Sequence, residues 1–396
     1  MSAPLTAAQR AQAIQTADDQ ATSILLNSPK VQPMFQLMPL SQAIGGNNVV
    51  QGNTYNFNLV NVGLNRSVIL EISGTIAPAA AEQLTATPWS IMNLISNVTL
   101  TDLSNYQRIN TKPRHMYAVS TARKRAAYGA AFLNDSPIKM GNNMGIVKAP
   151  AEVTAAQPFR FYIELPLAYG GGRSPLRGAV WANVTGGTWR VQLTFNQNPV
   201  VGSAATDLGE ACYQSSTAGD LGVISAINVN VYQDYLDQIP PDGKGGYILP
   251  TQSLAYNYEF KWAPQPAIVA NTNNAVNYTN FRTFLSTIAE YDNGGVYNPG
   301  TDVSNINIQV ANQAYTYLTG PYMTGLRTRQ LIGDDFPPAF YYIDHREKPI
   351  ITNNVGNTQL IFAPTTAAAG AVLNVYWEML SVLNQVLNAS SLPSGG

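Results

Sequence analysis

Short runs of alternating apolar and polar residues fill most of the chain beyond residue 31, and this pattern predicts β-strands. In one run, Tyr55, Phe57 and Leu59 alternate with Asn56 and Asn58, so one face of the strand is apolar and the other polar. The predicted strands include Tyr55–Val60, Val68–Ile76, Val98–Leu103, Phe159–Leu167, Trp189–Phe195 and Val223–Tyr232. Clusters of Gly, Pro and Asn separate such runs. Many short strands without regular intervening helices favour antiparallel sandwiches over a parallel sheet.

The N-terminal segment follows a helical period instead. Leu5–Leu26 is rich in Ala and Gln, contains no Gly or internal Pro, and stops before an Asn-Ser-Pro sequence. Ile14 and Leu25 share one side of the predicted helix, Ile24 lies beside them, and Asp18 is near the edge of this stripe. Such a modestly amphipathic helix is suited to docking on a protein or membrane surface.

Four short blocks occur twice in the same order, which indicates a duplicated domain. The paired blocks are Val119–Ala122 and Leu285–Ile288, Phe161–Glu164 and Tyr341–Asp344, Gln192–Phe195 and Gln359–Phe362, and Asn230–Leu236 and Asn374–Leu380. The offset between the copies falls from 180 residues at the second block to 144 at the last. The first copy therefore carries longer loops between equivalent strands.

The Pro- and Gly-rich stretch that begins at Pro240 directly follows the last block of the first copy, where a linker is expected. We predict five parts. They are an N-terminal helical arm (1–30), a first β domain (31–240), a linker (241–246), a second β domain (247–387) and a flexible tail (388–396).

The composition favours a protein that is buried in an assembly. Charged residues are only 11% of the 396 residues, against about 25% in typical proteins, and 21 tyrosines are present. Low charge and many aromatic residues characterise the cores of protein interfaces. The net charge of −1 argues against a protein that binds mainly a phosphate backbone.

Cys212 is the only cysteine, so the chain can form neither an internal disulfide nor a cysteine-based metal site. We see no signal peptide and no apolar stretch long enough to span a bilayer, and we expect synthesis in a cytoplasm.

One basic cluster stands out in this low-charge chain. Its members are Lys112, Arg114, Arg123, Lys124 and Arg125, with His115 among them. A solvated helix face is one interpretation; a contact with anionic lipid or a neighbouring subunit is the other.

The sequence contains no recognisable catalytic motif of the HExxH, GxSxG or Walker A type. His345 follows a predicted strand in a charged turn and has no assignable nucleophile. Asp334-Asp335 could ligate a hard cation, but the alternating oxygen ligands of an EF-hand are missing and a turn before a strand is favoured. The loop Asp292–Gly295 is a hairpin turn and a weak calcium candidate. Four acidic residues could form the carboxylate pair of a glycosidase, but each lies in a repeated block, where a structural role explains it equally well; they are Glu164, Asp234, Asp344 and Glu378. We predict no catalytic, cofactor or metal site.

Several motifs between residues 130 and 350 occur in an order that resembles the major capsid protein of tectiviruses, bacterial viruses with an internal membrane. The motifs are Asn134–Lys139, Pro166–Tyr169, Gly178–Val180, Tyr235–Gln238, Gly246–Pro250, Leu285–Ala289, Asp292–Gly295, Gly300–Asp302, Asp335–Pro337 and Lys348–Ile350. The resemblance places the chain in the double jelly-roll capsid lineage, which resembles the adenovirus hexon type.

This resemblance implies an all-β fold of two eight-stranded antiparallel jelly rolls side by side, with an N-terminal α-helix. It implies homotrimers that form pseudo-hexagonal capsomers of an icosahedral shell, without enzyme activity or a cofactor. The implied partners are neighbouring capsomers, penton and minor capsid proteins, and the internal membrane through the N-terminal arm, with no direct contact to nucleic acid. We name as candidate inner-shell or membrane contacts Ile14, Ile24, Leu25, Lys112, Arg123, Lys124 and Arg125.

Two other functions fit a β-sandwich chain. A carbohydrate-binding or carbohydrate-cleaving jelly roll, such as a viral spike or lectin, could use the Tyr and Trp residues as stacking platforms. A bacterial surface-layer or adhesion protein would require an export signal, which the sequence does not show.

Overall fold

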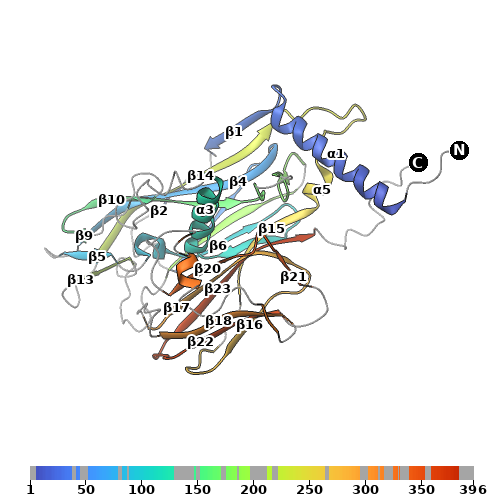
Figure 1. The fold of residues 1–396 in the computed structure, drawn as a ribbon. Coiled ribbons are helices and arrows are strands. Elements are labelled where there is room, and N and C mark those ends of the chain that lie inside the picture. Colours follow the sequence, from blue (N-terminus) through green and yellow to red (C-terminus); the bar gives the residue numbers. More distant parts are fainter. Residues whose placement is uncertain are drawn as a thin grey trace.

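The structure is a computed structural model in which two β-sandwiches lie side by side and a long N-terminal helix lies against the first (Figure 1). The residues that it describes are 6–37, 42–44, 52–78, 83–86, 89–128, 147–148, 152–170, 175–184, 187–196, 212–215, 222–263, 267–294, 302–310, 313–315, 324–328, 330, 339–352 and 358–382.

The first sandwich, called the first roll below, consists of two antiparallel layers. One has the strand order β1-β14-β4-β10-β8, with β2 beside β14 and β11 beside β4; the other has the order β7-β6-β12-β3. The strands are β1 (Gln32–Leu37), β2 (Gln42–Ile44), β3 (Thr54–Asn58), β4 (Leu64–Pro78), β6 (Ile95–Thr101), β7 (Gln107–Thr111), β8 (Val147–Lys148), β10 (Gln157–Pro166), β11 (Val180–Trp181), β12 (Arg190–Phe195) and β14 (Gly222–Asp237).

The second roll repeats this plan with shorter connections. One layer has the order β15-β23-β17-β20, with β21 beside β17, and the other has the order β16-β22-β18-β19. The strands are β15 (Tyr256–Trp262), β16 (Asn274–Asn277), β17 (Thr283–Asp292), β18 (Val303–Val310), β19 (Gln313–Tyr315), β20 (Phe340–Asp344), β21 (Ile350–Ile351), β22 (Thr358–Pro364) and β23 (Val372–Val382). Apart from the short strands β2, β8, β11 and β21, each roll has eight strands among the described residues, and the predicted double jelly roll is confirmed.

The remaining elements are short apart from two helices. Three short strands form a separate sheet at the far end of the first roll (Figure 1). These elements are β5 (Leu84–Ala86), β9 (Glu152–Val153), β13 (Tyr213–Ser215), η1 (Ser90–Leu94), α1 (Ala7–Asn27), α3 (Pro113–Tyr128) and α5 (Thr251–Leu254). The predicted N-terminal helix is confirmed as α1, and it begins with a capping box between Thr6 and Gln9.

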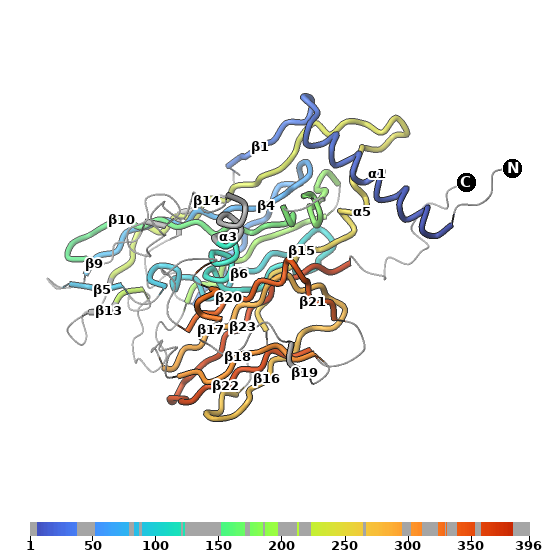
Figure 2. Tube along the Cα trace, in the orientation of Figure 1, coloured from blue at the N-terminus to red at the C-terminus, as the bar shows by residue number. Residues whose placement is uncertain are grey.

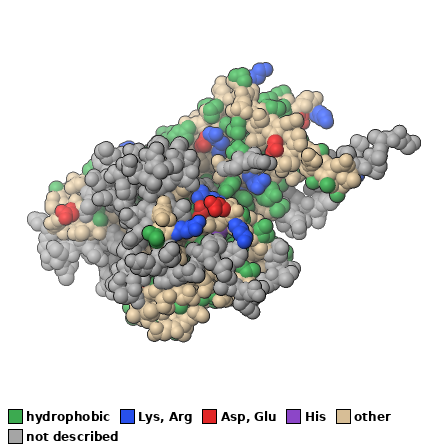
Figure 3. Space-filling model, in the orientation of Figure 1, with side chains coloured by type: hydrophobic (Ala, Val, Ile, Leu, Met, Phe, Trp, Pro, Cys, Tyr) green, Lys and Arg blue, Asp and Glu red, His purple; other side chains and the backbone are tan. Residues whose placement is uncertain are grey.

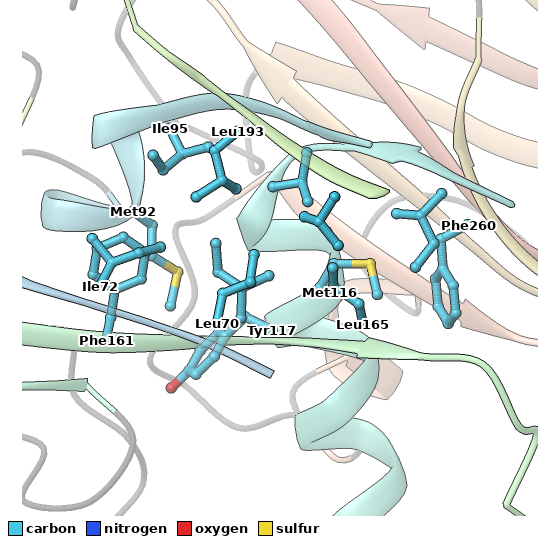
Figure 4. Close-up of a cluster of buried hydrophobic side chains, with 14 of the residues drawn as sticks. Leu70, Ile72, Met92, Ile95, Met116, Tyr117, Phe161, Leu165, Leu193 and Phe260 are labelled. Carbon is cyan, nitrogen blue, oxygen red and sulfur yellow. The ribbon is translucent and has the colours of Figure 1, made fainter. Parts of the chain in front are cut away.

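The core of the first roll lies between its two layers and extends into the second roll. Helix α3 packs against β10 and β6 and contributes Met116 and Tyr117 to this core. Phe260 belongs to the same cluster although it comes from β15 of the second roll (Figure 4). Figure 4 labels ten of these side chains: Leu70, Ile72, Met92, Ile95, Met116, Tyr117, Phe161, Leu165, Leu193 and Phe260.

The strand registers show which parts of the rolls correspond. In Figure 2, β14 runs beside β4 and β23 beside β17, and the pairs Asn230–Glu71 and Asn374–Glu290 lie at the same point of each ladder. The last block pair is therefore equivalent in position, and it ends the final strand of each roll. The second block pair lies on the equivalent strands β10 and β20. The two blocks are offset by two residues along these strands, because Tyr162 lies opposite Glu71 and Phe340 lies opposite Glu290.

The first block pair is wrong as a match between strands. Val119–Ala122 lies in helix α3, whereas Leu285–Ile288 lies in β17. The strand equivalent to β17 is β4, where Ser67–Glu71 matches Ser286–Glu290 at its serine, isoleucine and glutamate positions.

The predicted part boundaries stay predictions. The last strand of the first roll ends at Asp237, and β15 begins at Tyr256. The predicted tail 388–396 lies outside the described residues.

Gly178 provides a stability test where the rolls meet. Its φ is +88°, and an added Cβ would lie 2.7 Å from the Leu167 oxygen and 2.8 Å from Tyr258 Cβ in the second roll. We expect Gly178→Ala to lower the free energy of unfolding by about 2–5 kcal/mol through backbone strain and overpacking. The matched control is Gly243→Ala, because Gly243 has a φ of +75° but no atom within 4 Å of the added Cβ. Equal losses in urea unfolding would contradict the steric part of this expectation.

Candidate functional site: the seam between the rolls and the N-terminal arm

The two rolls share one sheet. Strand β7 of the first roll pairs in parallel with β15 of the second, with Ile109 opposite Phe260 and Asn110 opposite Lys261. This pairing joins four strands of the first roll to five of the second in a nine-stranded sheet. We call the contact between the rolls, centred on this pair, the seam.

A buried carboxylate is bonded from both sides of the seam. Glu290 of β17 accepts a hydrogen bond from Trp89 Nε1 (2.8 Å). It also forms an ion pair with Arg114 of α3 (3.0 Å). Tyr376 and Asn374 of β23 donate to it within the second roll. A buried carboxylate is stable only with such partners, so the side chains of the first roll complete a site that the second roll cannot complete alone.

Aromatic rings and two basic side chains fill the space beside this carboxylate. The His115 ring stacks on Tyr376 at 5.1 Å and lies 5.4 Å from Phe260. Lys112 Nζ lies 4.6 Å from the centre of the Trp262 ring. Burial lowers the pKa of Lys112 to about 7, and the charge of Arg114 acts in the same direction. Lys112 is therefore part of the seam.

A second buried carboxylate lies on the strand that forms the parallel pair. Glu259 of β15 accepts hydrogen bonds from Tyr106 (3.0 Å) and Ser381, and it pairs with Lys261 (2.8 Å) and Arg282 (3.5 Å). Tyr106 precedes β7, so this network also spans the seam.

Three of the four candidate catalytic acids are held in separate structural bonds. Asp234 pairs with Arg66 at 2.5 Å, and Asp344 pairs with Arg346 at 2.6 Å. Glu378 accepts hydrogen bonds from Tyr258 and Ser286. Glu164 lies in β10 and is half-buried.

His345 follows β20, as expected for a turn, but its side chain is buried and lies 3.1 Å from Thr287 Oγ1. Burial lowers its pKa to about 3, so the ring is neutral at pH 7. Cys212 is also buried.

The two loop candidates for cation binding differ in what can be described. Asp334-Asp335 lies outside the described residues. The Asn293 side chain in the other loop bonds Asp302 and Thr366, and no group of three or more metal-binding side chains occurs in the part of the chain that the structure describes.

The N-terminal arm is attached to the body through its buried side. Asp18 accepts hydrogen bonds from the backbone of Gln252 (2.8 Å) and from the Ser253 hydroxyl (2.6 Å), at the start of α5. Leu25 is buried among side chains of the first roll. Ile14 and Ile24 remain 46% and 40% exposed.

The predicted contact residues are therefore not equivalent. Leu25 and Lys112 are engaged within the chain because apolar and aromatic side chains cover them, whereas Ile14 and Ile24 are exposed on α1. Arg123, Lys124 and Arg125 lie in α3, and their side chains are outside the described set. No helix among the described residues is long and apolar enough to cross a membrane.

Two side-chain hydrogen bonds occur in both rolls. Gln192 donates to Asn56 in the first roll, as Gln359 donates to Asn277 in the second. Tyr232 donates to Glu71 (3.0 Å), as Tyr376 donates to Glu290 (3.3 Å). The sequence analysis did not identify the two glutamates as equivalent, because it did not match Ser67–Glu71 with Ser286–Glu290. The signal that could have shown it is the serine, isoleucine and glutamate that the two segments share.

Two family models match most of the chain. The model described as P3 major capsid protein N-terminal matches residues 2–239, and the model described as P3 major capsid protein C-terminal matches residues 255–394. The chain belongs to the P3 major capsid protein family. A curated relative, the major capsid protein P3 of Enterobacteria phage PRD1, is 34% identical over 336 residues and is covered to 84%, as is this chain. Membership makes the chain a structural protein of the capsid shell of a phage virion.

Solved structures of other capsid proteins show the same fold. The MCP of Sulfolobus turreted icosahedral virus (STIV) has a TM-score of 0.63 at 9% identity, with 91% of this chain and 99% of that chain covered. The major capsid protein P2 of bacteriophage PM2 has a TM-score of 0.51 at 10% identity, with 89% and 99% covered.

The equivalent glutamates provide a matched test of the seam. We expect Arg114→Met to lower the free energy of unfolding by about 3–5 kcal/mol, because it leaves Glu290 buried without its cation. Arg160→Met is the control. Arg160 lies 3.2 Å from the equivalent Glu71 but its side chain is 55% exposed, so we expect a loss of about 0–1 kcal/mol. If both variants lose similar free energies of unfolding in urea, burial of the Arg114–Glu290 pair in the seam does not add to its contribution.

Proposed function

We propose that the chain forms homotrimeric capsomers that tile an icosahedral shell. The observation that carries this proposal is the duplication: two rolls with equivalent strands and equivalent Gln–Asn and Tyr–Glu hydrogen bonds. Three chains with two similar rolls each supply six similar lobes, which suits a locally hexagonal lattice. The family membership and the low charge of the chain support this role.

The low charge of the chain suits such tiling. Charged residues are only 11% of the sequence, and Figure 3 shows a group of them near the centre of one face and others apart from it, among uncharged side chains. Uncharged polar groups can be packed against neighbouring capsomers at a low desolvation cost. Penton and minor capsid proteins are further proposed partners at positions where the hexagonal lattice ends, and no direct contact with nucleic acid is proposed.

The arm is proposed to face an internal membrane of the virion. Ile14 and Ile24 are large exposed apolar residues of α1, while Asp18 and Leu25 fix the helix to the body. Ile14 is exposed because it belongs to the first part of the helix, where residues 6–17 are all exposed. An anchored helix with exposed apolar side chains fits a lipid surface at the headgroup level. The basic residues Arg123, Lys124 and Arg125 are proposed to add attraction to anionic lipid.

A carbohydrate-processing function is not favoured. Three of the four acids that it would use are engaged in separate structural bonds, and the family is one of capsid proteins.

The first prediction is the size of the particle in solution. We expect a trimer of about 128 kDa, three times the 42.7 kDa of the chain, that persists on dilution because obligate interfaces bury on the order of 2,000–5,000 Å². Multi-angle light scattering over a dilution series measures this mass. A stable 42.7 kDa species at all concentrations would contradict the trimer.

The second prediction concerns the arm. We expect the Ile14→Asp, Ile24→Asp double variant to remain trimeric and to melt like the wild type, because both side chains are exposed, but to lose at least about tenfold in binding to vesicles of phosphatidylglycerol and phosphatidylethanolamine. Val269→Asp is the control, since Val269 is 53% exposed on the second roll. Unchanged vesicle sedimentation of the double variant would refute membrane contact through the arm.

A further inference from the structure

The outer face of the first roll repeats the face of the second roll that forms the seam. Phe35 of β1 lies opposite Asp234, and Phe260 of β15 lies opposite Glu378, which is the residue equivalent to Asp234. Two residues further along, Leu37 lies opposite Tyr232, as Trp262 lies opposite Tyr376. Aromatic and large apolar side chains thus occupy equivalent places on both faces.

The two faces differ in what covers them. Phe260 is fully buried in the seam, whereas Phe35 is 59% exposed and stacks on Tyr232 at 5.2 Å. Leu37 is 48% exposed, while Trp262 lies under Lys112. A Phe and a Leu exposed side by side on an edge strand are the kind of apolar edge that soluble proteins normally cover.

The carboxylate of the seam is also present on this face. Glu71 accepts a hydrogen bond from Tyr232, as Glu290 does from Tyr376. The cation at Glu290 comes from the other roll, through Arg114. The cation at Glu71 comes from the same sheet, through Arg160, whose side chain is mostly exposed. The first roll therefore offers the same acidic and aromatic surface that the second roll offers to α3.

The second roll carries counterparts of the elements that cover this surface in the seam. Strand β19 borders β18 at the edge of its sheet, as β7 borders β6. Residues 324–328 form a short helix that follows β19 and hydrogen-bonds to β20 through Thr328. In the same way, α3 follows β7 and packs against β10, the strand equivalent to β20. Leu326 is 47% exposed on this helix, and Arg327 is also exposed.

We propose that the face formed by Phe35, Leu37, Glu71 and Tyr232 binds the second roll of another copy of this chain, through its 324–328 helix and its β19 edge. This proposal rests on the proposed trimer and names the surface that forms it. The contact is head-to-tail, and a head-to-tail contact closes into a ring when its rotation fits three copies. Each copy then repeats between chains the seam that it contains within itself.

Charge favours a second copy over lipid as the occupant. Glu71 and Glu164 lie on the central strands of this face, and Asp234 lies opposite Phe35. Arg66 pairs with Asp234 and Arg160 pairs with Glu71, so three carboxylates stand against two arginines. The face therefore lacks the excess of positive charge that attracts an anionic membrane surface. The carboxylates suit the exposed Arg327, as Glu290 suits Arg114.

The test compares single-residue variants of the full chain by light scattering over a concentration series. We expect Phe35→Asp to raise the concentration at which half of the trimer has dissociated by at least about 100-fold, because it places a charge in an apolar contact. Glu71→Lys should weaken the trimer by at least about tenfold. Val223→Asp is the matched control, since Val223 is 42% exposed on β14 of the same sheet, eleven residues from the position opposite Phe35. It should leave the trimer unchanged.

A crosslink keeps the test informative if Phe35→Asp does not fold, as judged by circular dichroism. Leu37→Cys and Leu326→Cys in one chain should give covalent trimers with a bismaleimide, because Cys212 is buried. Chains with only one of the two added cysteines should give none.

The outcomes separate the two proposals. A trimeric wild type with a trimeric, folded Phe35→Asp would overturn this surface and leave the capsomer intact as a proposal. A trimeric Phe35→Asp variant that loses only shell assembly would assign the face to contacts between capsomers, and one that loses only vesicle binding would assign it to lipid. Either result would overturn the proposed contact between chains. A monomeric wild type would instead refute the trimer itself.

Discussion

The parallel pairing of β7 with β15 is the contact on which the rest of the molecule depends. Parallel neighbours need a long connection, and here α3 and the strands from β8 to β14 lie between them in sequence. The pairing places the outer face of the second roll against α3 and η1. A sheet face that would otherwise meet water becomes part of the core of the first roll. The relative setting of the two rolls is thus fixed by burial.

Charge makes this contact specific. Hydrophobic burial alone would hold the rolls together without choosing one orientation, because it has little directionality. Glu290 and Glu259 are each satisfied only when donors from particular loops and strands converge on them. A sliding of the rolls would leave these carboxylates buried and unpaired, which is costly. The seam therefore combines apolar area with a small number of demanding polar partners.

The sequence was informative where a pattern is local. Helix α1, the strand runs and the end of each roll follow from period and turn residues. The first block pair failed because four residues of mixed apolar and hydroxyl character fit a helix and a strand equally well, and Val119–Ala122 packs as part of α3. The seam was not predictable, since Trp89 and Glu290 lie 201 residues apart and carry no shared local signal.

The sequence by itself determined that the chain is a duplicated all-β protein, and its motifs indicated the family. It could not determine which faces of the two rolls are covered. Phe35 and Phe260 are the same residue type at equivalent positions, yet Phe35 is 59% exposed and Phe260 is buried in the seam. Only the tertiary structure decides this, because burial depends on what the rest of the chain places above a residue.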